Sequence, residues 1–394
     1  MARALGIDPG TKSFDLVLVD GELVVWEKSI ETSEIARNPM VLVEAINEAG
    51  EYDLVAGPSG YGTPIVCNED IVDPRVFALE ILLLTPSSDV EEGVRRGDPG
   101  MMVYKALADV VEALWRSRGK VCYIPSVILL PTIPRHRKIN KLDMGTADKM
   151  AIAVLGVYDQ AKRLGISYDD VSFILVEMGF GYNAVIGVEN GRIVDGLGGT
   201  LTPTGFLTIG PIDAELAVAG RTWSRTDVFH GGVADICGTY SIEEFLKKKD
   251  KESICSDAYE SMMESLVKNV KAVNHVVKKP REILVSGRLT RYKEIYRDLT
   301  NRLSEIAPVS KIQGLPGAKI SKEAAQGYAI IGEGIAGGVF NSLIKHMKIL
   351  EAKGTVLDYV YHPQLKSAQK RIYEAYKKSI KEDALKKLGV NFRV

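Results

Sequence analysis

Apolar runs separated by short polar turns open the chain. Residues 4–7 are apolar, a second run covers residues 14–19, and a third covers residues 23–26. Asp20-Gly21 lies between the second and third runs. An Asp-Gly pair between two such runs favours a β-hairpin, because its tight turn needs positive φ at both central residues. The pattern predicts three antiparallel strands, with a polar turn after the first at residues 8–13.

The same pattern returns at residue 173. An apolar run over residues 173–176 ends in Glu177, Gly179 follows two residues later, and Asn190-Gly191 separates the next two runs. Asp8 and Gly10 have the same relation at the first turn. Because the acid, the glycine and the hairpin recur in the same order, we infer an internal duplication.

The duplication predicts two similar domains in the 394 residues, a length that suits about two domains. We place an N-terminal domain at residues 1–170, a C-terminal domain at 171–340 and a helical extension at 341–394. The extension carries 12 basic and 5 acidic residues. We expect it to be solvated and packed on a domain, with contact to nucleic acid or another partner as the alternative.

Capping signals and apolar stripes predict helices between these strands. The main ones run from Asn38-Pro39 to Gly50 and over residues 99–118, 147–164, 256–277 and 323–338. The last is rich in glycine and alanine. Each glycine inside a helix costs about 1 kcal/mol relative to alanine, so we expect a neighbouring backbone to approach it closely.

Composition narrows the classes of protein. Hydrophobic residues make up 46% of the chain and charged residues 26%, and the net charge is −1. These values exclude a disordered chain and do not favour nucleic acid as a partner. No apolar run reaches the roughly 18 residues of a membrane helix, and Asp8 interrupts any signal-peptide core. We expect a cytoplasmic protein that binds a small molecule and no membrane, and we leave a homodimer open.

Cysteine and histidine spacing gives no metal or disulfide signal. Cys67, Cys122, Cys237 and Cys255 form no Cys-x-x-Cys pair, and the five histidines show no His-x-x-x-His spacing. The expectation is four free thiols in a reducing compartment. The Lys247-Lys248-Lys249 run is expected in a solvated loop.

Common phosphate-binding motifs do not fit the glycine-containing turns. In Gly10-Thr11-Lys12-Ser13 a threonine separates glycine from lysine, and a hairpin follows where a P-loop needs a helix. Residues 179–184 match Gly-x-Gly-x-x-Ala, but they too precede a hairpin rather than a helix. What remains is a pair of turns whose backbone amides can wrap phosphate oxygens, each after a strand that ends in an acid able to hold Mg²⁺.

These segments resemble the acetate and sugar kinase, heat-shock chaperone and actin superfamily. Residues 5–11 are similar to its first phosphate motif, 177–181 to its second, 286–288 to its adenosine motif and 325–338 to its second connecting helix. The resemblance implies an α/β fold of two duplicated RNase H-like domains, with mixed sheets flanked by helices and an ATP cleft between them. Within the superfamily the chain most resembles the archaeal family of predicted butyrate kinases, in segments such as Asp53–Gly57, Leu130–Arg135 and Val188–Asp195.

The resemblance implies an ATP-dependent phosphotransferase that uses Mg²⁺. Asp8 would bind the metal, and Glu177 the metal's water shell or the attacking group. Asp148 would face the cleft or serve as a favourable charge at a helix N-terminus. The nucleotide would be bound by Gly10, Thr11, Lys12, Gly179, Phe180, Gly181, Ser286, Gly287 and Arg288. Gly57, Gly60, Tyr61 and Gly62 would form the substrate loop.

A short-chain carboxylate is the acceptor that the resemblance implies, giving an acyl phosphate. Such an acid needs a cation for its carboxylate and an apolar pocket for its tail. Arg135, with Arg137 second, is expected to supply the cation, and Val127–Leu130 the apolar segment. Two alternatives stay open: a kinase for a hydroxyl substrate, with Asp148 or Glu177 as general base, and a non-enzymatic regulator gated by nucleotide.

Overall fold

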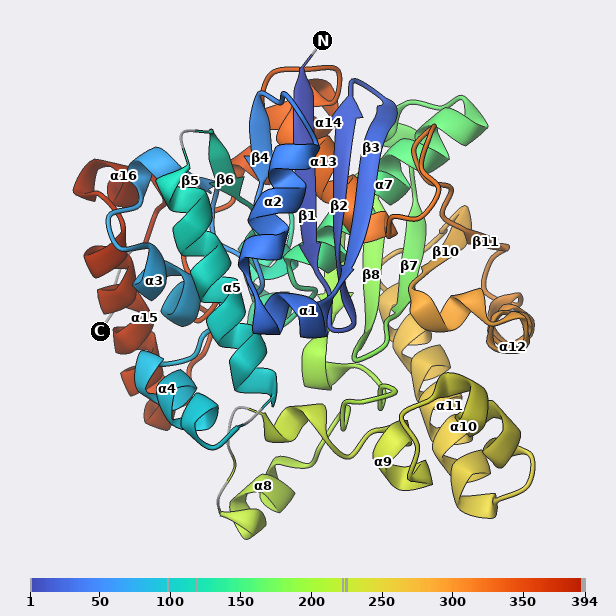
Figure 1. The fold of residues 1–394 in the computed structure, drawn as a ribbon. Coiled ribbons are helices and arrows are strands. Elements are labelled where there is room, and N and C mark those ends of the chain that lie inside the picture. Colours follow the sequence, from blue (N-terminus) through green and yellow to red (C-terminus); the bar gives the residue numbers. More distant parts are fainter. Residues whose placement is uncertain (1, 98, 118, 222, 224–225, 391–394) are drawn as a thin grey trace.

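Two mixed β-sheets with helices on their faces make up the protein (Figure 1). The computed structural model describes residues 2–97, 99–117, 119–221, 223 and 226–390. Among these residues, no helix combines the length and the apolar character needed to cross a membrane.

The first sheet has the strand order β3-β2-β1-β4-β6-β5. The first three strands are antiparallel, β4 and β6 are parallel to β1, and β5 is antiparallel to β6. The strands are β1 (Arg3–Pro9), β2 (Ser13–Asp20), β3 (Leu23–Glu31), β4 (Leu54–Ala56), β5 (Val66–Cys67) and β6 (Val121–Tyr123).

The second sheet repeats this arrangement in the order β11-β10-β7-β8-β9. Again three antiparallel strands come first, and two strands parallel to the first of them follow. They are β7 (Phe173–Met178), β8 (Asn183–Glu189), β9 (Arg192–Leu197), β10 (Glu282–Ser286) and β11 (Val309–Lys311). Asn190 and Gly191 have φ of 51° and 64° in the β8–β9 turn, as the hairpin signal requires. The duplicated pair of mixed sheets predicted from the sequence is confirmed.

Helices cover both sheets and fill the space between them (Figure 1). α13 packs on β1, β2 and β4, and α7 packs on α13 and contacts β7 and β8, so this pair of helices joins the two sheets. The helices are α1 (Thr32–Arg37), α2 (Met40–Glu48), α3 (Pro74–Val76), α4 (Ser87–Arg95), α5 (Pro99–Arg116), α6 (Arg135–Lys138), α7 (Ala147–Leu164), α8 (Ala214–Gly220), α9 (Val233–Cys237), α10 (Ile242–Lys249), α11 (Ser253–Asn274), α12 (Lys293–Leu303), α13 (Glu323–Ile335), α14 (Asn341–His346), α15 (Lys366–Ser379) and α16 (Glu382–Lys387). A π-helical turn, η2 (Phe77–Leu82), follows α3.

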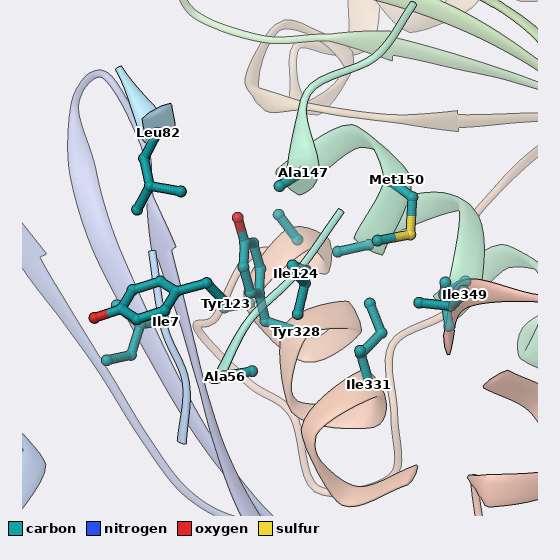
Figure 2. Close-up of a cluster of buried hydrophobic side chains, with 14 of the residues drawn as sticks. Ile7, Ala56, Leu82, Tyr123, Ile124, Ala147, Met150, Tyr328, Ile331 and Ile349 are labelled. Atoms are coloured by element: carbon teal, nitrogen blue, oxygen red, sulfur yellow. The ribbon is translucent and has the colours of Figure 1, made fainter. Parts of the chain in front are cut away.

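Small residues let α13 approach its neighbours, as predicted. A Cβ at Gly6 of β1 would come within 2.9 Å of Ala329 Cα and closer still to backbone atoms of α13. A Cβ at Gly327 would collide with the backbone of Ala151 on α7. Larger side chains pack around this junction, including Ile124, Met150 and Ile331 (Figure 2).

The C-terminal extension packs on the first sheet's part of the molecule. Tyr376 of α15 is buried and its hydroxyl lies 2.9 Å from Thr63 Oγ1. Ile380 forms an isolated antiparallel bridge with Ile71. Residues from α15 and α16 join the same hydrophobic cluster as β1 and α7.

Two expectations are wrong. Cys67 and Cys122 form a disulfide, because β5 lies antiparallel to β6 and places the two residues directly opposite each other. They are 55 residues apart in sequence, so local spacing gives no signal; Cys237 and Cys255 are free and buried, as expected. Lys247–Lys249 form the last turn of α10 rather than a loop, where lysine is favoured by the helix dipole.

Candidate functional site

A cavity of about 580 Å³ lies where the two halves of the molecule meet. It is bounded by the ends of β1, β7 and β10, by the turns that follow β1 and β7, and by the first turns of α7 and α13. Residues of η2 and α5 also line it. The cavity is therefore lined both by the predicted acids and by residues of η2 and α5, which the sequence did not indicate as part of a site.

The first turn is held tightly against α13. Asp8 ends β1 opposite Asp15 of β2, and both side chains are buried. A Cβ at Gly10 would lie 2.7 Å from the carbonyl oxygen of Ser13 and would meet Lys322 Nζ. Any larger residue at Gly10 would displace the ammonium group of Lys322, which pairs with the carboxylates of Asp8 and Asp15.

The two predicted phosphate turns face each other. A Cβ at Gly181 would lie 3.3 Å from Thr11 Oγ1, and Lys12 Nζ lies 5.5 Å from the centre of the Phe180 ring. Phe180 also packs on Phe206, so its ring is directed into the second half of the molecule. Both turns can present backbone amides to one anionic ligand.

The segment after β10 completes this side of the cavity. Ser286 pairs with Glu177 across parallel strands, and its buried hydroxyl oxygen has no hydrogen-bond partner in the described part of the chain. Gly287 has φ of 97°, and a Cβ there would meet the carbonyl oxygen of Met178. Arg288 Nη2 donates to Ser13 Oγ at 3.4 Å, so this segment reaches the first turn.

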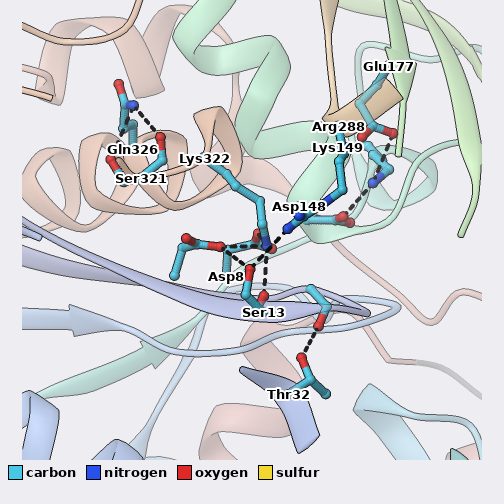
Figure 3. Close-up of polar contacts among 12 residues, drawn as sticks. Asp8, Ser13, Thr32, Asp148, Lys149, Glu177, Arg288, Ser321, Lys322 and Gln326 are labelled. Carbon is cyan, nitrogen blue, oxygen red and sulfur yellow. Dashed lines mark hydrogen bonds and ion pairs between the residues drawn. The ribbon is translucent and has the colours of Figure 1, made fainter. Parts of the chain in front are cut away.

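Two lysines link the strand-end acids into what we call the carboxylate–ammonium cluster (Figure 3). Lys322 Nζ lies 2.6 Å from Asp15 Oδ2 and 3.3 Å from Asp8 Oδ2. Lys149 Nζ lies 2.7 Å from Asp148 Oδ2 and 3.1 Å from Glu177 Oε2. The cluster comprises Asp8, Asp15, Asp148, Glu177, Lys149 and Lys322.

Burial sets the protonation of these groups. It raises the pKa of Asp8 to about 6 against the opposing effect of Lys322, and that of Glu177 to about 7 against the effect of Lys149. Burial acts in the same direction on Asp148, but Lys149 and a hydrogen bond from Thr146 hold its pKa below the usual value. Burial opposes the charge on Lys149, yet Asp148 and Glu177 raise its pKa, so it stays an ammonium group.

The cluster fits a hydrated Mg²⁺ ion rather than a closed metal cage. If all four carboxyl groups were ionised with Mg²⁺ present, the carboxylates and the two ammonium groups would carry a formal charge of −2, which one Mg²⁺ would balance. Glu177 Oε2 is buried and accepts no hydrogen bond from the described residues, since Lys149 approaches it without hydrogen-bond geometry. The described chain places no three His, Cys, Asp or Glu residues close enough to enclose a metal. Magnesium characteristically keeps several waters and uses one or two carboxylates with substrate phosphates.

Aliphatic side chains of η2 and α5 and of the residue after η2 form a further part of the cavity lining. We call it the apolar lining: Ala78, Leu82, Leu83, Val103, Leu107 and Val111. Leu82 belongs to η2, and Val103 and Leu107 belong to α5. Gly60 and Tyr61 of the predicted substrate loop also line the cavity.

Several predicted substrate residues lie elsewhere. Arg135 is exposed on α6, and both its Nε and Nη2 donate to Tyr361 Oη. Arg137 Nη1 donates to the carbonyl oxygen of Val194 at 2.8 Å. Neither arginine lines the cavity. The hydrophobic segment before their short helix, Val127–Leu130, is packed in the core and forms no part of the lining.

Gly57 and Gly62 of the predicted substrate loop do not line the cavity. Gly57 packs on the ring of Tyr123, with a Cβ position 3.0 Å from the ring, and Gly62 has φ of 82°.

The structure thus brings Asp8, Asp148, Glu177, the two turns and residues 286–288 together, and it separates them from Arg135 and Arg137. Sequence reasoning missed Lys149, Lys322, Tyr328 and the apolar lining, although Lys149 follows Asp148 directly and Lys322 immediately precedes the glycine-rich helix.

Comparisons with known proteins agree with this architecture. A family model described as "Protein of unknown function (DUF1464)" matches residues 6–362, and no curated protein matches the chain. Among solved structures, a propionate kinase from Francisella tularensis is similar with a TM-score of 0.54 and 12% identity, covering 84% of this chain and 98% of that one. Porphyromonas gingivalis acetate kinase is similar with a TM-score of 0.51 and 14% identity, covering 84% and 98%. The predicted two-domain actin-like ATPase fold is thereby confirmed.

Proposed function

The chain belongs to the DUF1464 family, and for this member we propose an ATP-dependent kinase that phosphorylates a short-chain carboxylate of about the size of butyrate. The observation that carries the proposal is the cavity itself. Its walls offer two facing phosphate turns and a carboxylate–ammonium cluster, and they also include the apolar lining. An alkyl chain buries its surface against such a lining, whereas a sugar would leave its hydroxyl groups without partners there.

The fold shared with an acetate kinase and a propionate kinase supports this choice. The sequence resemblance to predicted butyrate kinases supports a somewhat longer acyl chain. The aliphatic side chains Leu82, Leu107 and Val111 would contact such a chain.

The reaction requires no general base. A carboxylate with a pKa near that of glutamate is ionised at neutral pH, so one of its oxygens attacks the γ-phosphorus directly. A bond forms between that oxygen and phosphorus, the bond from phosphorus to the β–γ bridging oxygen breaks, and ADP leaves with the electron pair. No proton is transferred in this step.

Residues of this chain would position the two anions and balance their charge. Backbone amides at Gly10–Lys12 and Gly179–Gly181, with Arg288 and Lys12, would hold the phosphates. Mg²⁺, when bound with the nucleotide through water or one or two oxygens of Asp8 and Glu177, would neutralise charge on the β- and γ-phosphates. Lys149 and Lys322 would keep the remaining carboxylates from repelling the substrates.

One observation favours a second candidate. Burial raises the pKa of Glu177 to about 7, a value suited to a general base that accepts a proton from a hydroxyl acceptor. Asp148 is a poorer base because Lys149 and Thr146 hold its pKa low. A kinase for an alcohol or sugar is therefore the alternative that the test must separate.

The test is ATP consumption with Mg²⁺ across two panels, straight-chain acids from acetate to hexanoate and a set of alcohols and sugars. We expect turnover with acids and a maximum near four carbons. Asp8→Asn, which keeps the side-chain volume and removes the charge, serves as the inactive control. Turnover with alcohols or sugars alone would refute a carboxylate acceptor and favour Glu177 as base.

A further inference from the structure

Tyr328 of α13 carries a hydroxyl group that the fold buries without a partner. The side chain is fully buried, it lines the cavity, and its hydroxyl forms no hydrogen bond with a described residue. Figure 2 shows the hydroxyl directed away from α13, toward the part of the view in which Leu82 and Ala147 lie. A buried polar group left unpaired destabilises a protein, so a phenylalanine would be the better residue here if packing alone mattered.

Neighbouring side chains do not satisfy this hydroxyl. The amide and the hydroxyl of Ser59 both approach the Tyr328 oxygen as donors and lower its pKa, but neither reaches hydrogen-bond geometry, and the Tyr328 hydrogen is left without an acceptor. The Ser59 hydroxyl itself donates to the carbonyl oxygen of Gly57 at 2.8 Å and accepts from the Ile124 amide at 2.9 Å. Burial keeps the pKa of Tyr328 well above that of free tyrosine, with Asp148 and Asp8 acting in the same direction. The group therefore stays protonated and keeps one hydrogen to donate.

The position of Tyr328 links two parts of the cavity lining. Leu82, which packs in the same cluster, belongs to the apolar lining. Asp8 and Asp148, whose charges act on the hydroxyl, belong to the carboxylate–ammonium cluster. A group bound by its tail on the apolar lining would bring its polar head to this boundary.

We propose that the Tyr328 hydroxyl donates a hydrogen bond to the carboxylate of the acceptor and so sets the acceptor's orientation. The inference rests on the proposed function, because it takes a carboxylate with an alkyl tail as the ligand. An ionised carboxylate only accepts hydrogen bonds, which matches a hydroxyl that is free to donate. With one carboxylate oxygen held by Tyr328, the other is left to face the γ-phosphate. Tyr328 thus takes the substrate-holding role that the sequence suggested for Arg135.

The experiment compares Tyr328→Phe with Tyr123→Phe. Tyr123 is the matched control, because its hydroxyl is also fully buried and unpartnered among the described residues but does not line the cavity. Each variant loses one oxygen and no hydrogen bond. We expect the melting temperature of both ligand-free variants to equal or exceed that of the wild type, which a structural role for either hydroxyl would not produce.

Binding of acids is measured by thermal shift with butyrate and hexanoate, and turnover by kcat and KM for the same acids. Hydrogen bonds to charged groups predict that Tyr328→Phe raises the Kd and KM for the acid roughly 10- to 100-fold. Tyr123→Phe should leave both unchanged, and Mg-ATP should stabilise all three proteins equally.

The two proposals fail separately. If acids bind to the wild type more tightly than to Tyr328→Phe but are not phosphorylated, the kinase assignment fails and the role of Tyr328 stands. If acids are phosphorylated with the same KM by Tyr328→Phe, the role of Tyr328 is refuted and the kinase assignment stands. Absence of any acid binding to the wild type, or equal weakening by Tyr123→Phe, also refutes the role of Tyr328.

Discussion

The crossing of α7 and α13 makes a quantitative prediction about Gly327. A Cβ at this position would lie 3.0 Å from Ala151 Cα and closer to the carbonyl group of Ala151. The partner atoms are backbone, so no side chain can rotate away, and the two helices would have to separate by roughly 1 Å, a strain typical of overpacked cores. Gly327→Ala should therefore destabilise the protein by about 2 kcal/mol. This is a net value, in which the ~1 kcal/mol gained from the helix propensity of alanine offsets part of a larger steric cost.

Gly332→Ala is the matched control in the same helix. A Cβ there would lie 3.2–3.3 Å from Ala4 Cβ, Leu54 Cδ2 and Ala56 Cβ, so α13 and the strands beneath it would have to separate by only a few tenths of an ångström. Its net effect should be within about 1 kcal/mol of zero, since it gains the same helix propensity.

Thermal unfolding measures the difference. An unfolding entropy of about 2.1 cal/mol/K per residue converts 2 kcal/mol into a drop of about 2–3 °C for a chain of this length. We expect this drop, or a larger one, for Gly327→Ala and a smaller change of either sign for Gly332→Ala. If Gly327→Ala were as stable as Gly332→Ala or the wild type, the close helix crossing would be refuted as the reason for glycine at position 327.

Three further predictions concern the ligands and pH. Millimolar Mg-ATP should raise the melting temperature of the wild type by mass action and that of Asp8→Ala much less; an undiminished shift in the variant would exclude Asp8 from the nucleotide site. Leu107→Trp fills the apolar lining and should shift the preferred acid toward acetate in a kcat/KM series, and an unchanged chain-length profile would place the acyl tail elsewhere. Burial raises the pKa of Glu27, but hydrogen bonds from Ser321 and from the amides of residues 319–321 outweigh it and lower the pKa. The stability that the ionised Glu27 contributes is present above its unfolded pKa and is lost as pH falls through the folded value. Glu27→Gln should therefore melt below the wild type at pH 7, and the gap should shrink only as pH falls below about 4.5, whereas a gap that stays constant below that pH would contradict the charge dependence of these hydrogen bonds.

Most of the fold could be predicted because local signals and the global fold agree. The turn residues at Asp20 and Asn190 predict two β-hairpins. The recurrence of this hairpin pattern along the chain predicts the two similar sheets. Glycines in residues 323–338 indicate a close crossing whatever the partner is. Such signals act over a few residues, so they can be read without knowing the tertiary structure.

The candidate site could be predicted only where an element ends in a functional residue. Asp8 and Glu177 end strands that the pattern identifies, whereas Lys322 reaches Asp8 across 314 residues. A lysine before a helix has no sequence feature that distinguishes a buried ion-pair partner from a solvated side chain. The same holds for Cys67 and Cys122, whose pairing depends on the register of two short strands.

The apolar lining is a part of the cavity that the sequence does not indicate. Residues of η2 and α5 face the cavity because the chain folds back over the first sheet, and their aliphatic character alone would equally suit a buried core. The sequence points to Arg135 because its basic cluster follows an apolar segment and because Pro134-Arg135 resembles the butyrate kinases, but the apolar segment, Val127–Leu130, is buried in the core. Burial against a specific neighbour is a tertiary property that spacing does not encode.

Trapping of the reaction product with hydroxylamine tests the central claim most directly. An acyl phosphate reacts with hydroxylamine to give a hydroxamate, whereas a phosphate ester of an alcohol or sugar does not. With Mg-ATP and butyrate or a close homologue, the account predicts a hydroxamate formed in proportion to ADP, and none with Asp8→Asn. ADP formation without hydroxamate for every acid from acetate to hexanoate would contradict it.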